Sequence, residues 1–487
     1  MRRELSSPNR AEEARSTRLG TVALIVVALV FVTIALPVVL RGAPLADDFV
    51  NCLQPQRVGL ASTLADSFER LGVLRRAHLL EIIITTEVCQ HLPFGVAIAI
   101  PLLLTLGIAM VLRGLLRDLG VPEPWPSLGG ALWLLQPLGT EAGLWPAAMH
   151  VPLGLVLALA ALRFHRRGRH LWGALAVLGA GLSVEQVLLA LPLAVWLTSP
   201  PEHRRRAFGI TIAVVATLLI ASVVWPGGDP RLRLTLGERV AGAVDDPAFL
   251  VKFPAVGLGL HSIPLAVRWV FPPSVMILAL GALLGSWLGP MLLSTPETWE
   301  SDRTRAWRTL LAGVGLIALI NIPVILNVPH QGSPRLFAPT WLVLSGMVAT
   351  IGPLLVRRRR RWLGAVAGVF AAGALLSLSL SVWVRLESAS FTVYASRRIA
   401  DEVADDAVVA VCEVRRTVVE PAPRGAFAVH EFVYDWAARD ALDYYTGRRA
   451  SFELAGDPWQ DRSCPDPDDV DRVFSFSDLL SGWENDG

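Results

Sequence analysis

Long apolar runs, separated by short polar segments, dominate the first 385 residues of the chain. A helix that crosses a hydrocarbon core ~30 Å thick needs about 20 mainly apolar residues. The first run has this length and is followed by no small-residue cleavage site, so we interpret it as a membrane anchor and not as a signal peptide. The pattern predicts an α-helical polytopic membrane protein with about eleven spans, the four between 127 and 198 being short: 19–40, 94–112, 127–146, 150–162, 171–183, 186–198, 207–225, 271–293, 309–327, 339–356 and 363–385.

The pattern changes after residue 385, where short apolar stretches alternate with amphipathic ones. Strands are predicted at 407–413, in AFAVHEFV (426–433), in SFELA and in RVFSF, and helices in SRRIADEVADD and YDWAARDALDYYTG. This alternation predicts a small α/β domain over 386–487.

Composition agrees with a membrane protein. The chain is 53% hydrophobic and only 18% charged, whereas soluble domains carry about 25% charged residues. The formal net charge is +2, which gives no reason to expect a nucleic-acid partner.

The distribution of arginine predicts the orientation of the chain. Cytoplasmic loops are enriched in Lys and Arg, and here every second predicted loop is basic. We therefore expect a plasma-membrane protein with a cytoplasmic tail over 1–18, a membrane domain over 19–385 and an extracytoplasmic domain over 386–487. The long outer loops would cover 41–93 and 226–270. The basic groups are Arg2, Arg3, Arg10, Arg15 and Arg18, then Arg113 and Arg117, the cluster 163–170, Arg204 to Arg206, Arg303 to Arg308, and 357–361.

The first outer loop contains the main candidate catalytic residues. An acidic pair, Asp47 and Asp48, follows the first span in the stretch PLADDFVN. Further along, the segment 64–84 has apolar residues at three- and four-residue spacing, which predicts an interfacial helix on the outer leaflet.

All four cysteines lie outside the membrane in this topology, in a space that permits disulfides. We expect two bridges, Cys52–Cys89 and Cys412–Cys464. The chain contains no CxxC motif and no His/Cys cluster, which argues against a zinc site.

Several segments, taken in order, resemble the integral-membrane glycosyltransferases of the GT-C class, which use polyprenyl-phosphate sugars. They are the acidic pair after the first span, QPLGTEAGLWPAAMHVPLGLVLALA (136–160), LSVEQVLLALPLAV (182–195), SPRLFAP (333–339) and DALDYYTGRR (440–449). The resemblance implies a GT-C-like fold, a lipid-linked sugar donor, and a glycan or protein acceptor. The first loop lacks the His-Pro-Pro motif of some members, which leaves the subfamily open.

Sugar transfer requires a base that removes the proton of the acceptor hydroxyl. Asp47 or Asp48 would serve, and like-charge repulsion between the two favours proton uptake. If the segment is extended, the two side chains point in opposite directions, and we favour Asp47 because it is nearer the membrane. The pair could also hold a divalent cation, Mg²⁺ or Mn²⁺.

The leaving lipid phosphate needs cationic partners, and the acceptor needs groups that orient it. For the phosphate we expect Arg335 and His330, with Lys252, Arg231 and Arg233 as further candidates. Glu141 and His150 are the candidates for orienting the acceptor.

Three other functions remain open. A transporter or flippase for lipid-linked saccharides would show intramembrane charged pairs and internal repeats, and the sequence has neither. A non-catalytic assembly protein for cell-envelope glycans could dock partners on the acidic tail, where 21 Asp and Glu face 10 Arg. A polymerase or ligase of lipid-linked glycans is the third, and its outer face would carry Arg and His in place of an acidic pair.

Overall fold

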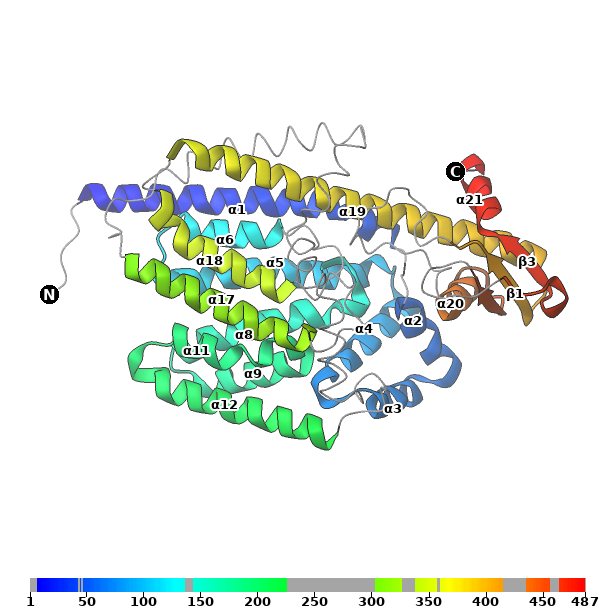
Figure 1. The fold of residues 1–487 in the computed structure, drawn as a ribbon, viewed down its shortest axis with the longest axis horizontal. Helices are drawn as coiled ribbons and strands as arrows, with labels where there is room; N and C mark the ends of the chain where they lie inside the picture. Colours follow the sequence, from blue (N-terminus) through cyan, green and yellow to red (C-terminus); the bar gives the residue numbers. More distant parts are fainter. Residues whose placement is uncertain are drawn as a thin grey trace.

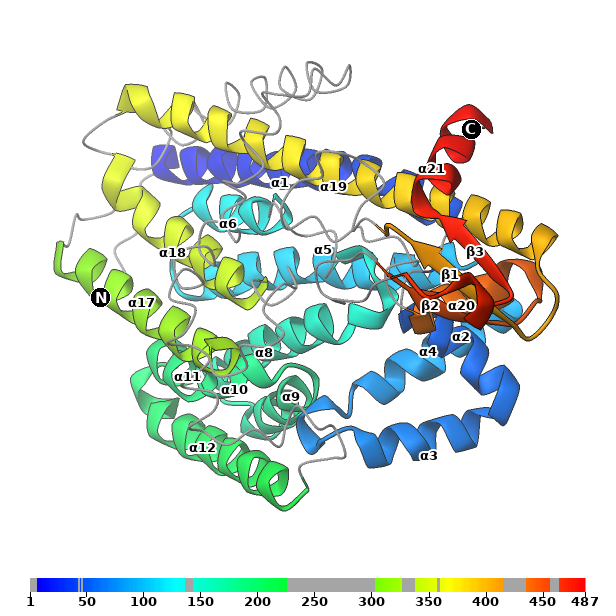
Figure 2. The same cartoon turned by 45° about the vertical axis from the view of Figure 1, so that its right-hand side comes forward.

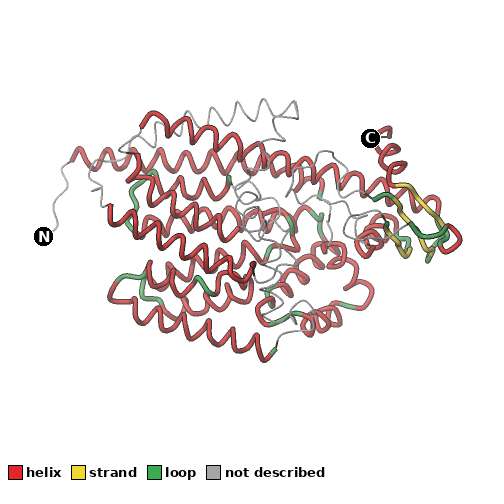
Figure 3. The backbone as a smooth tube through the Cα atoms, viewed as in Figure 1, coloured by secondary structure: helices red, strands yellow, loops and turns green. Residues whose placement is uncertain are grey.

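The computed structural model describes residues 7–42, 44, 47–135, 143–225, 303–325, 338–356, 360–414, 435–455 and 464–486. Helices make up most of this part of the chain, and its strands are confined to one end of the molecule (Figure 3). The helices lie roughly alongside one another, and the sheet caps the end at which α19 finishes (Figure 1). The protein is thus a helical bundle with a small α/β unit attached, as predicted.

Four described segments are long and apolar enough to cross a membrane: Ala14–Arg41, Gly95–Asp118, Pro146–Arg166 and Pro201–Val224. They correspond to α1 (Ser7–Arg41), α5 (Gly95–Asp118), α8 (His150–Arg166) with the turn before it, and α12 (Pro201–Val224). Large apolar side chains on their outer faces are exposed, and Val223 reaches 81%. Exposed apolar surface of this kind suits contact with lipid.

The remaining bundle helices cover most of the other predicted spans, with different lengths. They are α6 (Trp125–Leu134), α9 (His170–Ser183), α10 (Glu185–Leu188), α11 (Leu191–Thr198), α17 (Arg303–Ile325) and α18 (Ala338–Val356). The span expected over 186–198 is wrong as a single helix, because α10 ends at Leu188 and α11 restarts with a proline in its first turn. The span expected at 271–293 lies outside the described residues.

Helices α1 and α5 approach each other closely near the end of the bundle that carries the first loop. A Cβ added to Gly95 would lie 2.0 Å from the carbonyl oxygen of Val39, so no larger residue fits there without backbone movement. This contact fixes the end of α1, from which the first loop leaves the bundle.

The first loop folds into three helices and a short turn: α2 (Asp47–Val58), α3 (Leu60–Arg70), η1 (Val73–Arg75) and α4 (His78–His91). The single amphipathic helix expected over 64–84 is therefore wrong. The chain turns at Leu71 and Gly72, whose backbones are extended, and this break separates α3 from η1 and α4.

A 43-residue helix, α19 (Arg360–Glu402), connects the bundle to the C-terminal unit and passes without a break through the boundary expected at 385/386. It leads into β1 (Ala407–Cys412), α20 (Asp435–Thr446), β2 (Ala450–Leu454), η7 (Pro467–Asp469), β3 (Arg472–Ser475) and α21 (Phe476–Asp486). The strands form a parallel sheet in the order β2-β1-β3. The strands predicted at 407–413, SFELA and RVFSF are confirmed, whereas 426–433 lies outside the described residues.

The ends of α5 and α8 that lie away from the first loop carry paired basic side chains. There Arg113 pairs with Glu123 at 3.1 Å, Arg163 pairs with Asp118 at 2.9 Å, and Arg166 donates to the carbonyl oxygen of Thr198. These basic residues and the first loop thus lie at opposite ends of the bundle.

Candidate functional site

The acidic pair opens helix α2, immediately beyond the end of α1. Asp47 and Asp48 are the first two residues of this helix, where carboxylates interact favourably with the unpaired backbone N–H groups. The extended conformation considered from the sequence is therefore wrong. The two side chains still diverge, because successive residues of a helix point about 100° apart.

The two carboxylates have different surroundings. Asp48 is fully buried, and its Oδ1 accepts a hydrogen bond from the backbone N–H of Ala147 at 3.0 Å. Asp47 is half-buried, and no hydrogen bond or ion pair involves it among the described residues. Asp48 therefore anchors the start of α2 to the turn η2 (Pro146–Ala148), and Asp47 stays accessible.

Glu81 forms a second polar centre on the other side of η2. This residue of α4 is fully buried and lies between the imidazoles of His78 and His150. His78 Nδ1 faces Glu81 Oε2, while Glu81 Oε1 lies 2.6 Å from Nδ1 of His150 and accepts the His150 backbone N–H. Burial raises the pKa of Glu81, but the two imidazoles outweigh this and bring it to about 2.

Disulfides join the elements that carry these groups. Cys52 of α2 is bonded to Cys89 of α4, with Cα atoms 5.6 Å apart, and the Thr86 hydroxyl donates to the carbonyl oxygen of Asn51 beside it. These two links hold α2 against α4.

The second disulfide lies in the C-terminal unit. It joins Cys412, the last residue of β1, to Cys464, with Cα atoms 5.5 Å apart. The two pairs are those expected from the sequence.

The C-terminal unit packs directly on the acidic helix, and Figure 2 shows α20 beside α2. Phe49, next to Asp48, makes edge contacts with the rings of Tyr444 and Tyr445, at centroid distances of 5.3 and 5.7 Å. Burial, and then the charge of Asp48, raise the pKa of Tyr444. The segment DALDYYTG, part of a predicted helix and of the resemblance, thus packs beside Phe49 and Asp48.

One arginine joins the two units. Arg57 of α2 donates to Asp440 of α20 at 3.0 Å and also to Asp443, while the Asp440 side chain is only 3% exposed. A buried carboxylate needs such a cation, because an unpaired charge away from water is costly.

Replacing this cation should loosen the C-terminal unit. We expect Arg57→Ala to destabilise the α2–α20 contact by about 2 kcal/mol, the usual value for a hydrogen bond to a charged group. The loss of this contact should be seen as faster hydrogen exchange in α20 and β2, measured by mass spectrometry. Arg70→Ala is the matched control, because Arg70 forms an exposed pair with Asp66 on neighbouring α3. Equal exchange in both variants would contradict the prediction.

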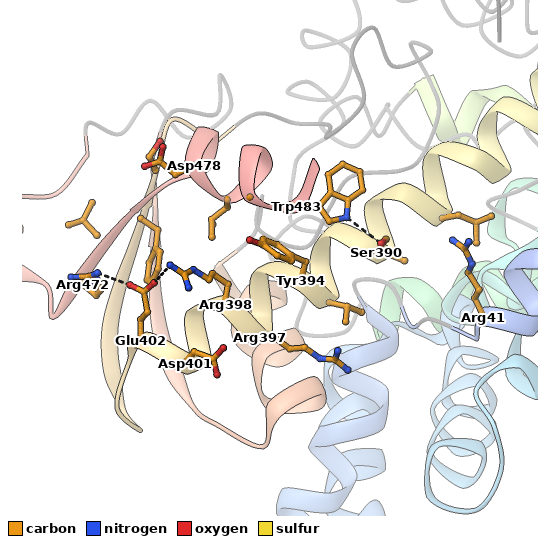
Figure 4. Close-up of a pocket in the computed structure, with 18 residues that line it drawn as sticks. Arg41, Ser390, Tyr394, Arg397, Arg398, Asp401, Glu402, Arg472, Asp478 and Trp483 are labelled. Atoms are coloured by element: carbon orange, nitrogen blue, oxygen red, sulfur yellow. Dashed lines mark hydrogen bonds and ion pairs between the residues drawn. The ribbon is translucent and has the colours of Figure 1, made fainter. Parts of the chain in front are cut away.

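An open groove of about 1070 Å³ runs from the end of α1 along α19 to β3 and α21 (Figure 4). Glu402 within it is paired with Arg398 at 2.7 Å and with Arg472 at 2.6 Å. Arg41 and Arg397 also line the groove, and both are exposed and have no ion pair among the described residues. These two cations are available to an anionic ligand.

The structure brings only some of the predicted site residues together. Asp48 bonds to Ala147 of η2, and His150, three residues further along the chain, faces Glu81. Arg57, Arg41 and Arg397 were not singled out from the sequence, although Arg41 ends the helix just before the acidic pair. The predicted residues that lie outside the described part of the chain are Glu141, Arg231, Arg233, Lys252, His330 and Arg335.

Comparison with known proteins gives no family. No protein-family model matches this chain, and no curated protein matches its sequence.

Proposed function

We propose that this protein is a membrane glycosyltransferase that moves a sugar from a polyprenyl-phosphate donor to a hydroxyl acceptor on the outer face of the membrane. The acidic pair at the start of α2 carries the proposal. Its position just beyond a candidate span, with Asp48 buried and anchored and Asp47 accessible, suits a reaction at the membrane surface.

Asp47 acts as the general base in this proposal. Its carboxylate takes the proton of the acceptor hydroxyl while the acceptor oxygen bonds to the anomeric carbon of the sugar. The bond between that carbon and the lipid-phosphate oxygen breaks, and its electron pair leaves with the phosphate. Asp48 positions the base through its hydrogen bond to Ala147.

The leaving phosphate needs cations near the outer surface. Arg41 precedes the acidic pair by only a few residues and lines the groove together with Arg397. A guanidinium can form two parallel hydrogen bonds to phosphate oxygens. We therefore add Arg41 and Arg397 to the candidates for this role that the sequence suggests, which are Arg335, His330, Lys252, Arg231 and Arg233.

The distribution of basic residues supports the proposed orientation. With the basic end of the bundle in the cytoplasm, the first loop and the C-terminal sheet face outward. Both disulfides then lie in a compartment that allows them to persist.

The test is sugar transfer by the purified protein from a panel of radiolabelled polyprenyl-phosphate sugars, with glycan and peptide acceptors. We expect transfer by the wild type and none above background by the double variant Asp47→Asn/Asp48→Asn. Equal transfer by both proteins would remove the acidic pair from the mechanism. Export of an intact lipid-linked saccharide, without transfer, would instead favour the flippase.

A further inference from the structure

We propose that His78, Glu81 and His150 form a binding site for a divalent transition metal, with Zn²⁺ as the ion that matches their donors best. Two imidazoles and one carboxylate are a ligand set typical of zinc sites. The proposal does not depend on the transferase activity, and it differs from a cation held by the acidic pair.

The geometry brings one donor atom of each residue within 4.8 Å of the other two. His78 and Glu81 are three residues apart on α4, a spacing that puts two side chains on the same helix face. His150 comes from the first turn of α8. Zinc holds its N and O ligands at about 2.0–2.2 Å, so donors in a tetrahedral site lie roughly 3.3 Å apart.

Burial gives the carboxylate a need for a cation. Glu81 is fully buried, and its Oε2 faces Nδ1 of His78 while its Oε1 faces Nδ1 of His150. An ionised carboxylate away from water is costly unless charge or hydrogen bonds compensate it. As metal ligands, the two imidazoles would each donate a nitrogen lone pair to the ion. A divalent ion at the centre would satisfy all three groups.

The ligands are held in place by contacts outside the site. The Ala77 backbone N–H donates to Leu182 O at 3.1 Å, which ties the start of α4 to α9. The bond from Ala147 to Asp48 ties η2, which leads into His150, to α2. Such support keeps ligands near coordination geometry and favours affinity.

Three protein ligands leave a fourth position for water or a substrate, as in catalytic zinc sites. The side chains of His78 and His150 are 27% and 24% exposed, so an ion can reach the site from solvent. The sequence argued against zinc because it lacks Cys motifs, but this site uses histidines that are 72 residues apart in the chain (150 − 78).

Metal content is the direct test. The full-length protein, purified in detergent with a tag that contains no histidine, is stripped with a chelator and titrated with Zn²⁺. Metal per chain is then measured by mass spectrometry. We expect one tightly bound Zn²⁺ in the wild type, and affinity weakened by about 100-fold or more in Glu81→Gln and His150→Ala, beyond the loss caused by removing a supporting contact.

Two variants serve as controls. His91→Ala removes an exposed histidine, paired with Glu87, from the far end of the same helix. His170→Ala removes one member of the His165–His170 pair in the bundle. Both should keep the tight Zn²⁺.

Circular dichroism establishes that each variant is folded, and His150→Ala is the gentler change because its ring is partly exposed. No tight Zn²⁺ in the wild type, or the same Zn²⁺ in Glu81→Gln and His150→Ala, would overturn the proposal. Glu81 and its histidines would then form a hydrogen-bonded triad without metal.

Discussion

Asp47→Asn is expected to lower kcat for sugar transfer by about 10²- to 10⁴-fold, the usual contribution of a general base. The KM for the donor should change little, because the substitution alters the proton acceptor and not the shape of the site. The fold should be unaffected, since the Asp47 side chain is half-buried and makes no hydrogen bond among the described residues. Steady-state kinetics with a labelled donor would measure both constants.

Two further variants separate the roles of the carboxylates. Asp48→Asn keeps an oxygen that can accept the Ala147 N–H, so it should retain more activity than Asp47→Asn. Asp66→Asn removes an exposed carboxylate from the same loop and should leave kcat unchanged. A larger loss in Asp48→Asn than in Asp47→Asn would exchange the two roles and make Asp48 the base.

Removal of the disulfide between α2 and α4 should have the largest effect on stability. The bridge spans 37 residues, and the chain-entropy relation for a loop of that length gives roughly 4 kcal/mol. We expect Cys52→Ser/Cys89→Ser to lower the free energy of unfolding by about this amount, measured by denaturant unfolding in detergent. Transfer activity should fall as well, because α2 carries the acidic pair.

The second disulfide is a matched control for that experiment. It spans 52 residues, so the same relation also gives roughly 4 kcal/mol. Cys412→Ser/Cys464→Ser should expose the sheet to hydrogen exchange but retain tight Zn²⁺, since no ligand lies in the C-terminal unit. Loss of the metal from this variant, and not from Cys52→Ser/Cys89→Ser, would contradict the assignment of the ligands to α4 and α8.

The sequence predicts elements whose signal is local. Apolar runs long enough to cross a bilayer mark α1, α5 and α12, and the alternating residues of SFELA mark β2. The break between α10 and α11 was missed, since a short apolar run reads the same whether or not a turn interrupts it. The continuation of α19 past the membrane segment is not visible in the sequence, because the polar residues of its last turns resemble the start of a new domain.

The candidate site could likewise be predicted from the sequence only where its residues are close together in the chain. The i, i+3 spacing of His78 and Glu81 is visible in the sequence, but the arrival of His150 depends on how η2 packs against α2 and α4. Likewise, Arg57 and Asp440 are 383 residues apart in the sequence, and no local sequence pattern predicts that they form a pair.

The unbroken course of α19 makes its length as important as its composition. At 1.5 Å per residue its 43 residues span roughly 65 Å, and each residue turns the chain by about 100°. One residue inserted beyond the bundle would therefore rotate the C-terminal sheet and α20 by that angle. The carboxylates of Asp440 and Asp443 would swing away from Arg57, and Tyr444 and Tyr445 would no longer pack on Phe49. The length of α19 therefore sets both the distance and the rotation of the C-terminal unit relative to the bundle. Insertions and deletions in this helix should be tolerated far less well than substitutions.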